Sequence, residues 1–182
     1  MRTTVVRMSA LLAVFGLLAL LPPVTFAQEG KSVPLVKELT QLLEQHKLDS
    51  IAAKDPAAPD GFVAALYFPG SQLLVVSARY AVPPLLVEKL GKKDFREIYT
   101  DLNSAAVEGS RSLVIDIGAD GLKPKKDDNH YDSCDIGPKS FTFDGDWKKQ
   151  KLNSEDDYTK AFVDADERYA KMLAALIAQV KK

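Results

Sequence analysis

The clearest pattern in the chain is an apolar stripe close to its C-terminus. Apolar side chains recur every three or four positions from Tyr158 to Val180, which is the spacing of one face of an α-helix. Ser154 precedes the stripe, and Asp157 stands three positions after Ser154, the order of an N-terminal capping box. We therefore expect a long C-terminal helix that packs along a sheet through Tyr158, Phe162, Ala165, Tyr169, Met172, Leu173, Leu176 and Val180.

A shorter helical pattern follows Ser32 and Pro34, two residues typical of a helix start. Apolar residues again recur at helical spacing, and they predict a helix over residues 34–48 whose apolar face holds Val36, Leu39, Leu42 and Leu43.

Short apolar runs between turn residues predict the strands. Residues 62–68 and 73–77 flank Pro69-Gly70-Ser71-Gln72, so they are expected to form a β-hairpin. Further strands are expected over residues 112–117 and 140–143. Because the hairpin strands are apolar on both faces, their sheet should be covered on both sides or curled into a barrel.

Other segments are read from their glycines and prolines. Residues 54–61, with Pro56 and Pro59, predict a loop, and the Gly-, Asp- and Lys-rich residues 118–138 predict a long surface loop. Residues 85–90 are expected to form a short helix that Gly91 ends. Residues 95–102 fit either a continuing helix face or a strand, and their β-prone centre favours a strand.

Together these elements predict one α+β domain. We expect an antiparallel sheet or partial split barrel, with an N-terminal helix and a long C-terminal helix packed on it.

The first 27 residues have the order of a secretory signal peptide. Arg2 and Arg7 form a basic start, residues 11–21 are apolar, and small residues lead up to a cleavage site between Ala27 and Gln28. The apolar run is shorter than the roughly 20 residues that a membrane span needs. We therefore expect a protein exported to the periplasm or secreted, with residues 28–182 as a single domain and no membrane span after cleavage.

The net charge and the cysteine count limit the kinds of partner and cross-link that the sequence predicts. The formal net charge is −1 and no basic patch stands out, so nothing predicts nucleic-acid binding. Cys134 is the single cysteine, which excludes a disulfide within one chain and leaves it buried, paired with another chain, or free and reactive. The fold must depend on its core.

The candidate metal ligands lie in the 116–135 region. Asp116, Asp120 and Asp127 occupy positions 1, 5 and 12 of a partial calcium loop, with Gly121 at position 6. The third position is Gly118, which offers no side-chain oxygen, so a solvated loop explains the same residues.

No catalytic set emerges from the motifs. The chain lacks G-x-S-x-G, H-E-x-x-H and a phosphate-binding glycine loop. His130 with Cys134 is the one local Cys–His pair, and Asp144 and Asp146 flank a glycine as turn residues do. Trp147, Phe141 and Phe143 could line a pocket or cover the core beneath the last helix.

The end of the second hairpin strand offers a possible ligand site. Arg79 and Tyr80 could bind an anion or stack on a ring, although a solvated strand end is the plainer interpretation.

Residues 73–121 resemble the FMN-binding split barrel, the fold of pyridoxamine 5'-phosphate oxidase. The resemblance is carried by the order of elements, by Ser77 and Arg79 at the strand end, by Lys89-Leu90, and by the strand pair 98–102 and 113–117. It implies a flavin or haem cofactor, held in part by Arg79, Tyr80 and Lys89. Family members usually bind the flavin phosphate with Lys or Arg where this chain has Val82-Pro83-Pro84. An α-β-β-α-β-β-α sandwich explains the same elements equally well.

Two functions therefore remain open at this point. The first is a non-catalytic, exported ligand-binding or accessory module for a small ligand or another exported protein. The second is a split-barrel protein that binds FMN or haem and could be an oxidoreductase.

Overall fold

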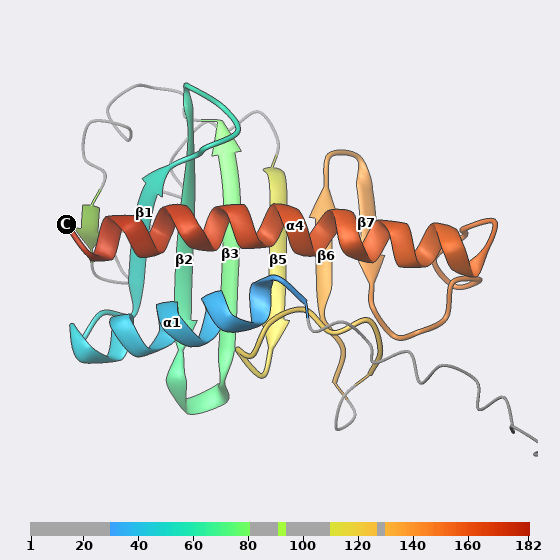
Figure 1. Ribbon diagram of the computed structural model, residues 1–182, viewed down its shortest axis with the longest axis horizontal. Helices are drawn as coiled ribbons and strands as arrows, with labels where there is room; N and C mark the ends of the chain where they lie inside the picture. Colours follow the sequence, from blue (N-terminus) through green and yellow to red (C-terminus); the bar gives the residue numbers. More distant parts are fainter. Residues whose placement is uncertain (1–29, 81–90, 94–109, 127–129) are drawn as a thin grey trace, which may run out of the picture.

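A seven-stranded antiparallel sheet forms the body of the described protein. The computed structural model describes residues 30–80, 91–93, 110–126 and 130–182. In these ranges the strand order is β4-β1-β2-β3-β5-β6-β7 (Figure 1). The strands are β1 (Ser50–Lys54), β2 (Gly61–Phe68), β3 (Leu73–Tyr80), β4 (Gly91–Lys93), β5 (Ser110–Ile117), β6 (Ser133–Ile136) and β7 (Lys139–Thr142).

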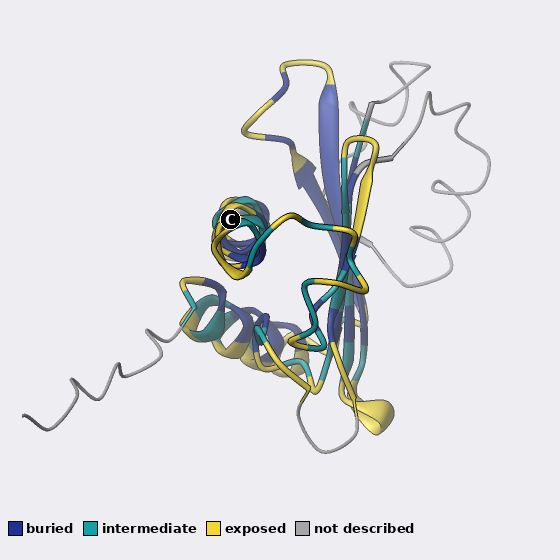
Figure 2. Cartoon of the chain, turned by 90° about the vertical axis from the view of Figure 1, so that its right-hand side faces the viewer, coloured by how far each residue is buried: buried dark blue, intermediate teal, exposed yellow. Residues whose placement is uncertain are grey.

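Two helices, α1 (Ser32–Gln45) and α4 (Glu155–Val180), cover one face of this sheet, as Figure 2 shows. α4 runs across the strands from the β7 side to the β4 side, and α1 packs beside it (Figure 1). The structure thus has an α+β fold with an antiparallel sheet and a helix from each end of the described chain. Neither helix is both long and apolar enough to cross a bilayer.

The predicted hairpin and the predicted terminal helices are confirmed. β2 and β3 pair in register from Gly61 with Tyr80 to Phe68 with Leu73, and a single 3-10 turn, η1 (Pro69–Ser71), joins them. At the start of α4 the Ser154 hydroxyl accepts a hydrogen bond from the Asp157 amide at 3.1 Å. All eight apolar residues expected on the inner face of α4 are buried.

The prediction of one long loop over residues 118–138 was wrong. β6 lies inside that range and pairs with both β5 and β7. Its polar residues, Ser133 and Asp135, face away from the helices and hide the alternation that places Cys134 and Ile136 on the inner face. β1 was also missed, because its alanine-rich sequence carries little β-propensity.

The apolar residues divide between the two faces of the sheet. The main cluster fills the space between the sheet and the helices, with Tyr169, Phe143, Leu39 and Leu43 among its fully buried members. A smaller cluster lies on the opposite face and consists of Ala52, Phe62, Ala64 and Leu66. Both faces of the central strands are therefore apolar, as their sequence predicts.

The sheet is open. β4 and β7 are its two edges among the described strands, and no pairing joins them, so the sheet does not close into a barrel. The short helix expected at residues 85–90 and the ambiguous segment 95–102 lie outside the described residues.

Polar side chains on α4 bind the loop after β1, strand β5 and the start of α1. Arg168 forms a bidentate ion pair with Asp55, at 3.1 and 2.8 Å, in the loop that follows β1. The Arg168 Nε also donates to the Ser112 hydroxyl of β5 at 3.2 Å. Asp166, on the same helix, accepts hydrogen bonds from the backbone N–H groups of Lys31, the N-cap residue of α1, and Ser32, its first residue.

Candidate functional site

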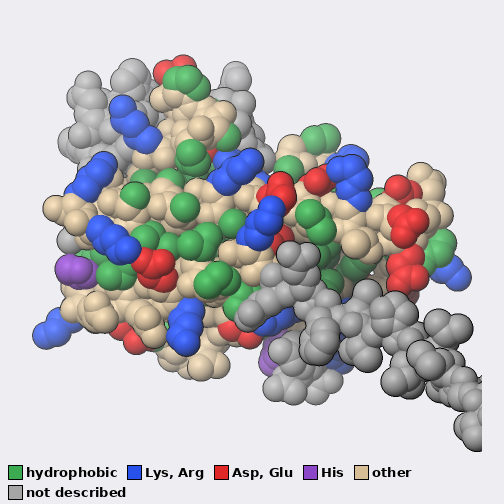
Figure 3. Space-filling model, viewed as in Figure 1, with side chains coloured by type: hydrophobic (Ala, Val, Ile, Leu, Met, Phe, Trp, Pro, Cys, Tyr) green, Lys and Arg blue, Asp and Glu red, His purple; other side chains and the backbone are tan. Residues whose placement is uncertain are grey.

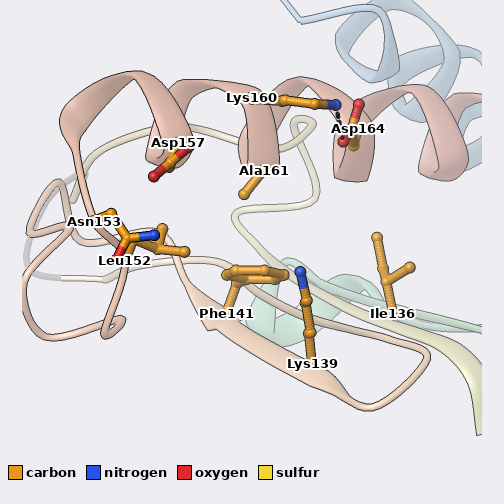
Figure 4. Close-up of a pocket in the computed structure, with 9 residues that line it drawn as sticks. All are labelled: Ile136, Lys139, Phe141, Leu152, Asn153, Asp157, Lys160, Ala161 and Asp164. Atoms are coloured by element: carbon orange, nitrogen blue, oxygen red, sulfur yellow. Dashed lines mark hydrogen bonds and ion pairs between the residues drawn. The ribbon is translucent and has the colours of Figure 1, made fainter.

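A cleft of about 470 Å³ lies between the β6–β7 hairpin and the N-terminal half of α4 (Figure 4). We call it the hairpin cleft. Its lining comes from three segments: the hairpin supplies Ile136, Lys139 and Phe141, the loop before α4 supplies Leu152 and Asn153, and α4 supplies Asp157, Lys160, Ala161 and Asp164.

The local sequence explains how the hairpin presents its side chains to the cleft. Gly137, with φ of +59°, and Pro138 make the turn between β6 and β7. This turn pairs Ile136 with Lys139 across the two strands, so both side chains lie on the helix-facing side of the sheet. Phe141 follows two residues after Lys139 and therefore shares that side.

The middle of the cleft is apolar. Phe141 is 8% exposed, and its ring stacks against that of Phe143 with 6.3 Å between the centroids. Leu152 and Ala161 are partly buried and pack against the main core from the other walls. This arrangement leaves an apolar floor that a small ligand can cover.

Charged side chains surround the floor. Lys160 pairs with Asp164 at 2.7 Å, and both side chains are largely exposed. Asp157 and Asn153 lie together at one end of the cleft, while Lys139 lies on the far side of Phe141, between it and Ile136 (Figure 4). Nothing in the described part of the chain forms an ion pair with Lys139 or with Asp157.

Of the residues that line this cleft, only Phe141 is a pocket candidate from the sequence. Trp147 packs against the main core, and Phe143 is fully buried there. A signal for the α4 wall was present, since Asp157, Ala161 and Asp164 follow the spacing of one helix face. It could not be used because the partner segment, Lys139 to Phe141, had not been placed against that face.

The structure places Asp116, the first candidate metal ligand, in a buried polar network beneath α4. Asp116 is 0% exposed and accepts hydrogen bonds from the Tyr169 hydroxyl at 3.0 Å and from the amides of Asp120 and Gly121. Asp120 instead lies near the surface and pairs with Lys123. Asp127 lies outside the described residues, so the proposed calcium loop stays a prediction.

A second buried carboxylate, Asp132, belongs to the same region. Its two oxygens accept the amides of Ile117 and Lys123, each at 2.8 Å. The residues described contain no group of three or more His, Cys, Asp or Glu side chains placed to hold a metal ion. Both carboxylates therefore act as caps for backbone N–H groups in the structure as described.

Burial is the main influence on these two acids. It raises the pKa of Asp116 to about 6, against the effect of the Tyr169 hydroxyl and two amides that stabilise the anion. It raises the pKa of Asp132 to about 7, with a further increase from the nearby negative charge of Asp116. The native state therefore binds protons on these groups at a pH where an unfolded chain does not.

The other predicted sites are separated in the structure. Arg79 is half-buried on the outer face of β3, opposite Phe62 of β2, and its Nε is buried without a hydrogen-bond partner. Tyr80 is the last residue of β3, and Lys89 lies outside the described residues. The proposed cofactor role of Arg79, Tyr80 and Lys89 stays a prediction.

Cys134 has the properties of a core residue. It is 2% exposed on β6, whereas His130 is exposed. Burial raises the pKa of the Cys134 thiol to about 12, which keeps it protonated and unreactive at neutral pH. Of the three states open to this cysteine from sequence, the structure shows the buried one.

Asp144 and Asp146 are turn residues, as expected. The Asp144 carboxylate accepts the Asp146 amide at 2.9 Å, and Gly145 between them has φ of +85°.

Comparison with protein-family models, with curated proteins and with solved structures finds no match to this chain.

The buried acids predict an inverted pH dependence of stability. Since the pKa values of Asp116 and Asp132 are raised to about 6 and 7, the stability linked to them is present at low pH and is lost as pH rises through those values. The melting temperature should therefore fall between about pH 4 and pH 7, as measured by circular dichroism in buffers of constant ionic strength. Asp132→Asn should flatten the upper part of this slope. A melting temperature that rises across the range would contradict the assignment.

The two half-buried arginines should respond oppositely to substitution. Arg168→Met removes the bidentate ion pair between α4 and the buried carboxylate of Asp55, so it should lower the free energy of unfolding by about 3–5 kcal/mol. Arg79→Met removes a buried donor that has no partner, so it should raise that free energy by about 1 kcal/mol. Urea unfolding of both variants tests this. Equal losses in the two variants would show that Arg79 has a stabilising partner.

Proposed function

We propose that this protein is a non-catalytic ligand-binding module, exported to the periplasm or secreted, that holds a small molecule in the hairpin cleft. The observation that carries the proposal is the cleft itself, which has an apolar floor at Phe141 and a charged rim. Its volume of about 470 Å³ falls within the range of small-molecule sites, about 300–1,000 Å³.

The elements around the cleft support a binding role. The floor belongs to the main core, and the α4 wall is fixed by the ion pair of Arg168 and the hydrogen bond of Tyr169 farther along the same helix. A site built on such elements keeps its shape without a ligand, which reduces the entropic cost of binding. The two carboxylates with raised pKa values, Asp116 and Asp132, lie elsewhere and accept hydrogen bonds from backbone N–H groups.

Export is supported by the sequence alone. Residues 1–27 have the basic, apolar and small-residue segments of a signal peptide.

Filling the cleft should abolish binding without unfolding the protein. Ala161 is partly buried and lines the cleft, so Ala161→Trp would occupy the space over Phe141. In a screen of small amphipathic compounds followed by NMR, ligands should shift the amide resonances of Ile136, Phe141 and Ala161. These shifts should disappear in Ala161→Trp.

The matched control is Ala174→Trp, because Ala174 is exposed on the same helix and lies outside the cleft. It should bind as the natural protein does. The proposal fails if no compound shifts the cleft resonances, or if Ala161→Trp binds as well as Ala174→Trp.

Export has its own test. Expressed from its full sequence in a bacterial host, the chain should be recovered from the periplasm or medium with Gln28 as its first residue, as N-terminal sequencing can establish. An uncleaved chain retained in the cytosol would refute this part of the proposal and leave the binding role untouched.

A further inference from the structure

The hairpin cleft has opposite charges on the two sides of Phe141. Asp157 projects from the first turns of α4 at one end of the cleft, and Lys139 projects from β7 on the far side of Phe141, between it and Ile136 (Figure 4). The two side chains do not pair with each other, because Phe141 and Ala161 lie between them. The cleft is therefore bipolar along its length.

The remaining charges of the cleft cancel. Lys160 and Asp164 form an ion pair one helical turn apart, so together they contribute no net charge to a ligand. Lys139 and Asp157 differ from them, since neither makes a salt bridge to a described residue, and the side chain of Lys139 makes no hydrogen bond there either. They are the two charges of the cleft left for a ligand to neutralise.

Figure 3 shows how the surface charges are distributed on the helix-bearing face. Lysine and arginine side chains are interspersed there with acidic ones over most of α4, and the acidic residues Glu155, Asp156 and Asp157 are confined to its first turn. Long-range attraction of a strongly charged partner is thus not favoured on this face, and recognition must depend on local pairing inside the cleft.

The geometry points to a ligand with an apolar body, a carboxylate at one end and an ammonium group at the other. The carboxylate would lie at Lys139, the ammonium at Asp157 beside Asn153, and the apolar body on Phe141 and Ala161. This inference rests on the proposed binding role of the cleft and adds the chemical class of the ligand. An α-amino acid with an uncharged side chain does not fit, because its ammonium and carboxylate groups are attached to the same carbon atom.

Three matched probes test the ligand class by NMR titration. The probe p-(aminomethyl)phenylacetate has both charges, p-methylphenylacetate lacks the ammonium, and p-methylbenzylamine lacks the carboxylate. Because each ion pair is partly exposed, it should contribute a modest gain, so the doubly charged probe should bind about twofold to fivefold more tightly than either methyl analogue.

Two variants then test which residue binds each charged group of the probe. Lys139→Met should remove the advantage of the carboxylate and leave the affinity for p-methylbenzylamine unchanged. Asp157→Asn should remove the advantage of the ammonium and leave the affinity for p-methylphenylacetate unchanged. The matched controls are Lys171→Met and Asp156→Asn, which alter exposed residues of α4 outside the cleft.

The outcomes separate this inference from the proposed function. If screened compounds bind the cleft but the doubly charged probe has no advantage, or does not bind, the ligand class is wrong and the binding role stands. If neither the probes nor any screened compound shifts the cleft resonances, the binding role itself fails. A charge preference that survives both Lys139→Met and Asp157→Asn also overturns the inference.

Discussion

The structure depends on how α4 is held across the sheet. Its apolar face closes the main core, and three nearby polar residues fix its position on that core. Asp166 binds the first turn of α1, Arg168 binds the loop after β1, and Tyr169 binds Asp116 at the end of β5. Each contact joins segments more than fifty positions apart in sequence, so these side chains specify which elements meet as well as stabilising them.

The interaction with α1 also replaces an ordinary helix cap. No side chain at the start of α1 caps its own amides, and the Asp166 carboxylate accepts the Lys31 and Ser32 N–H groups instead. A negative charge at this position also interacts favourably with the positive end of the helix dipole. Gly121 completes the contact, since a Cβ atom there would lie 2.6 Å from the Cα of Val33. The start of α1 and the chain after β5 can therefore approach each other closely.

More of the fold than of the cleft could be predicted from the sequence. Periodicity alone located α1, α4, the β2–β3 hairpin, β5 and β7, because each carries its own apolar pattern. β6 was not predicted because serine and aspartate interrupt the apolar pattern of a four-residue strand. β1 was not predicted because alanine has a low β-propensity. To predict the cleft, one would have to know that β7 lies under the first half of α4, and no local sequence pattern contains this information.

The same geometry explains why the cleft forms at this end of the sheet. β6 and β7 are four residues each, much shorter than the eight-residue strands β2, β3 and β5. α4 is 26 residues long and continues over and past this hairpin, as Figure 1 shows. A short hairpin presents too few inward side chains to fill the space beneath a long straight helix, so part of that space stays open to solvent. The long helix closes the core over the central strands, and its overhang beyond them creates the walls of the cleft.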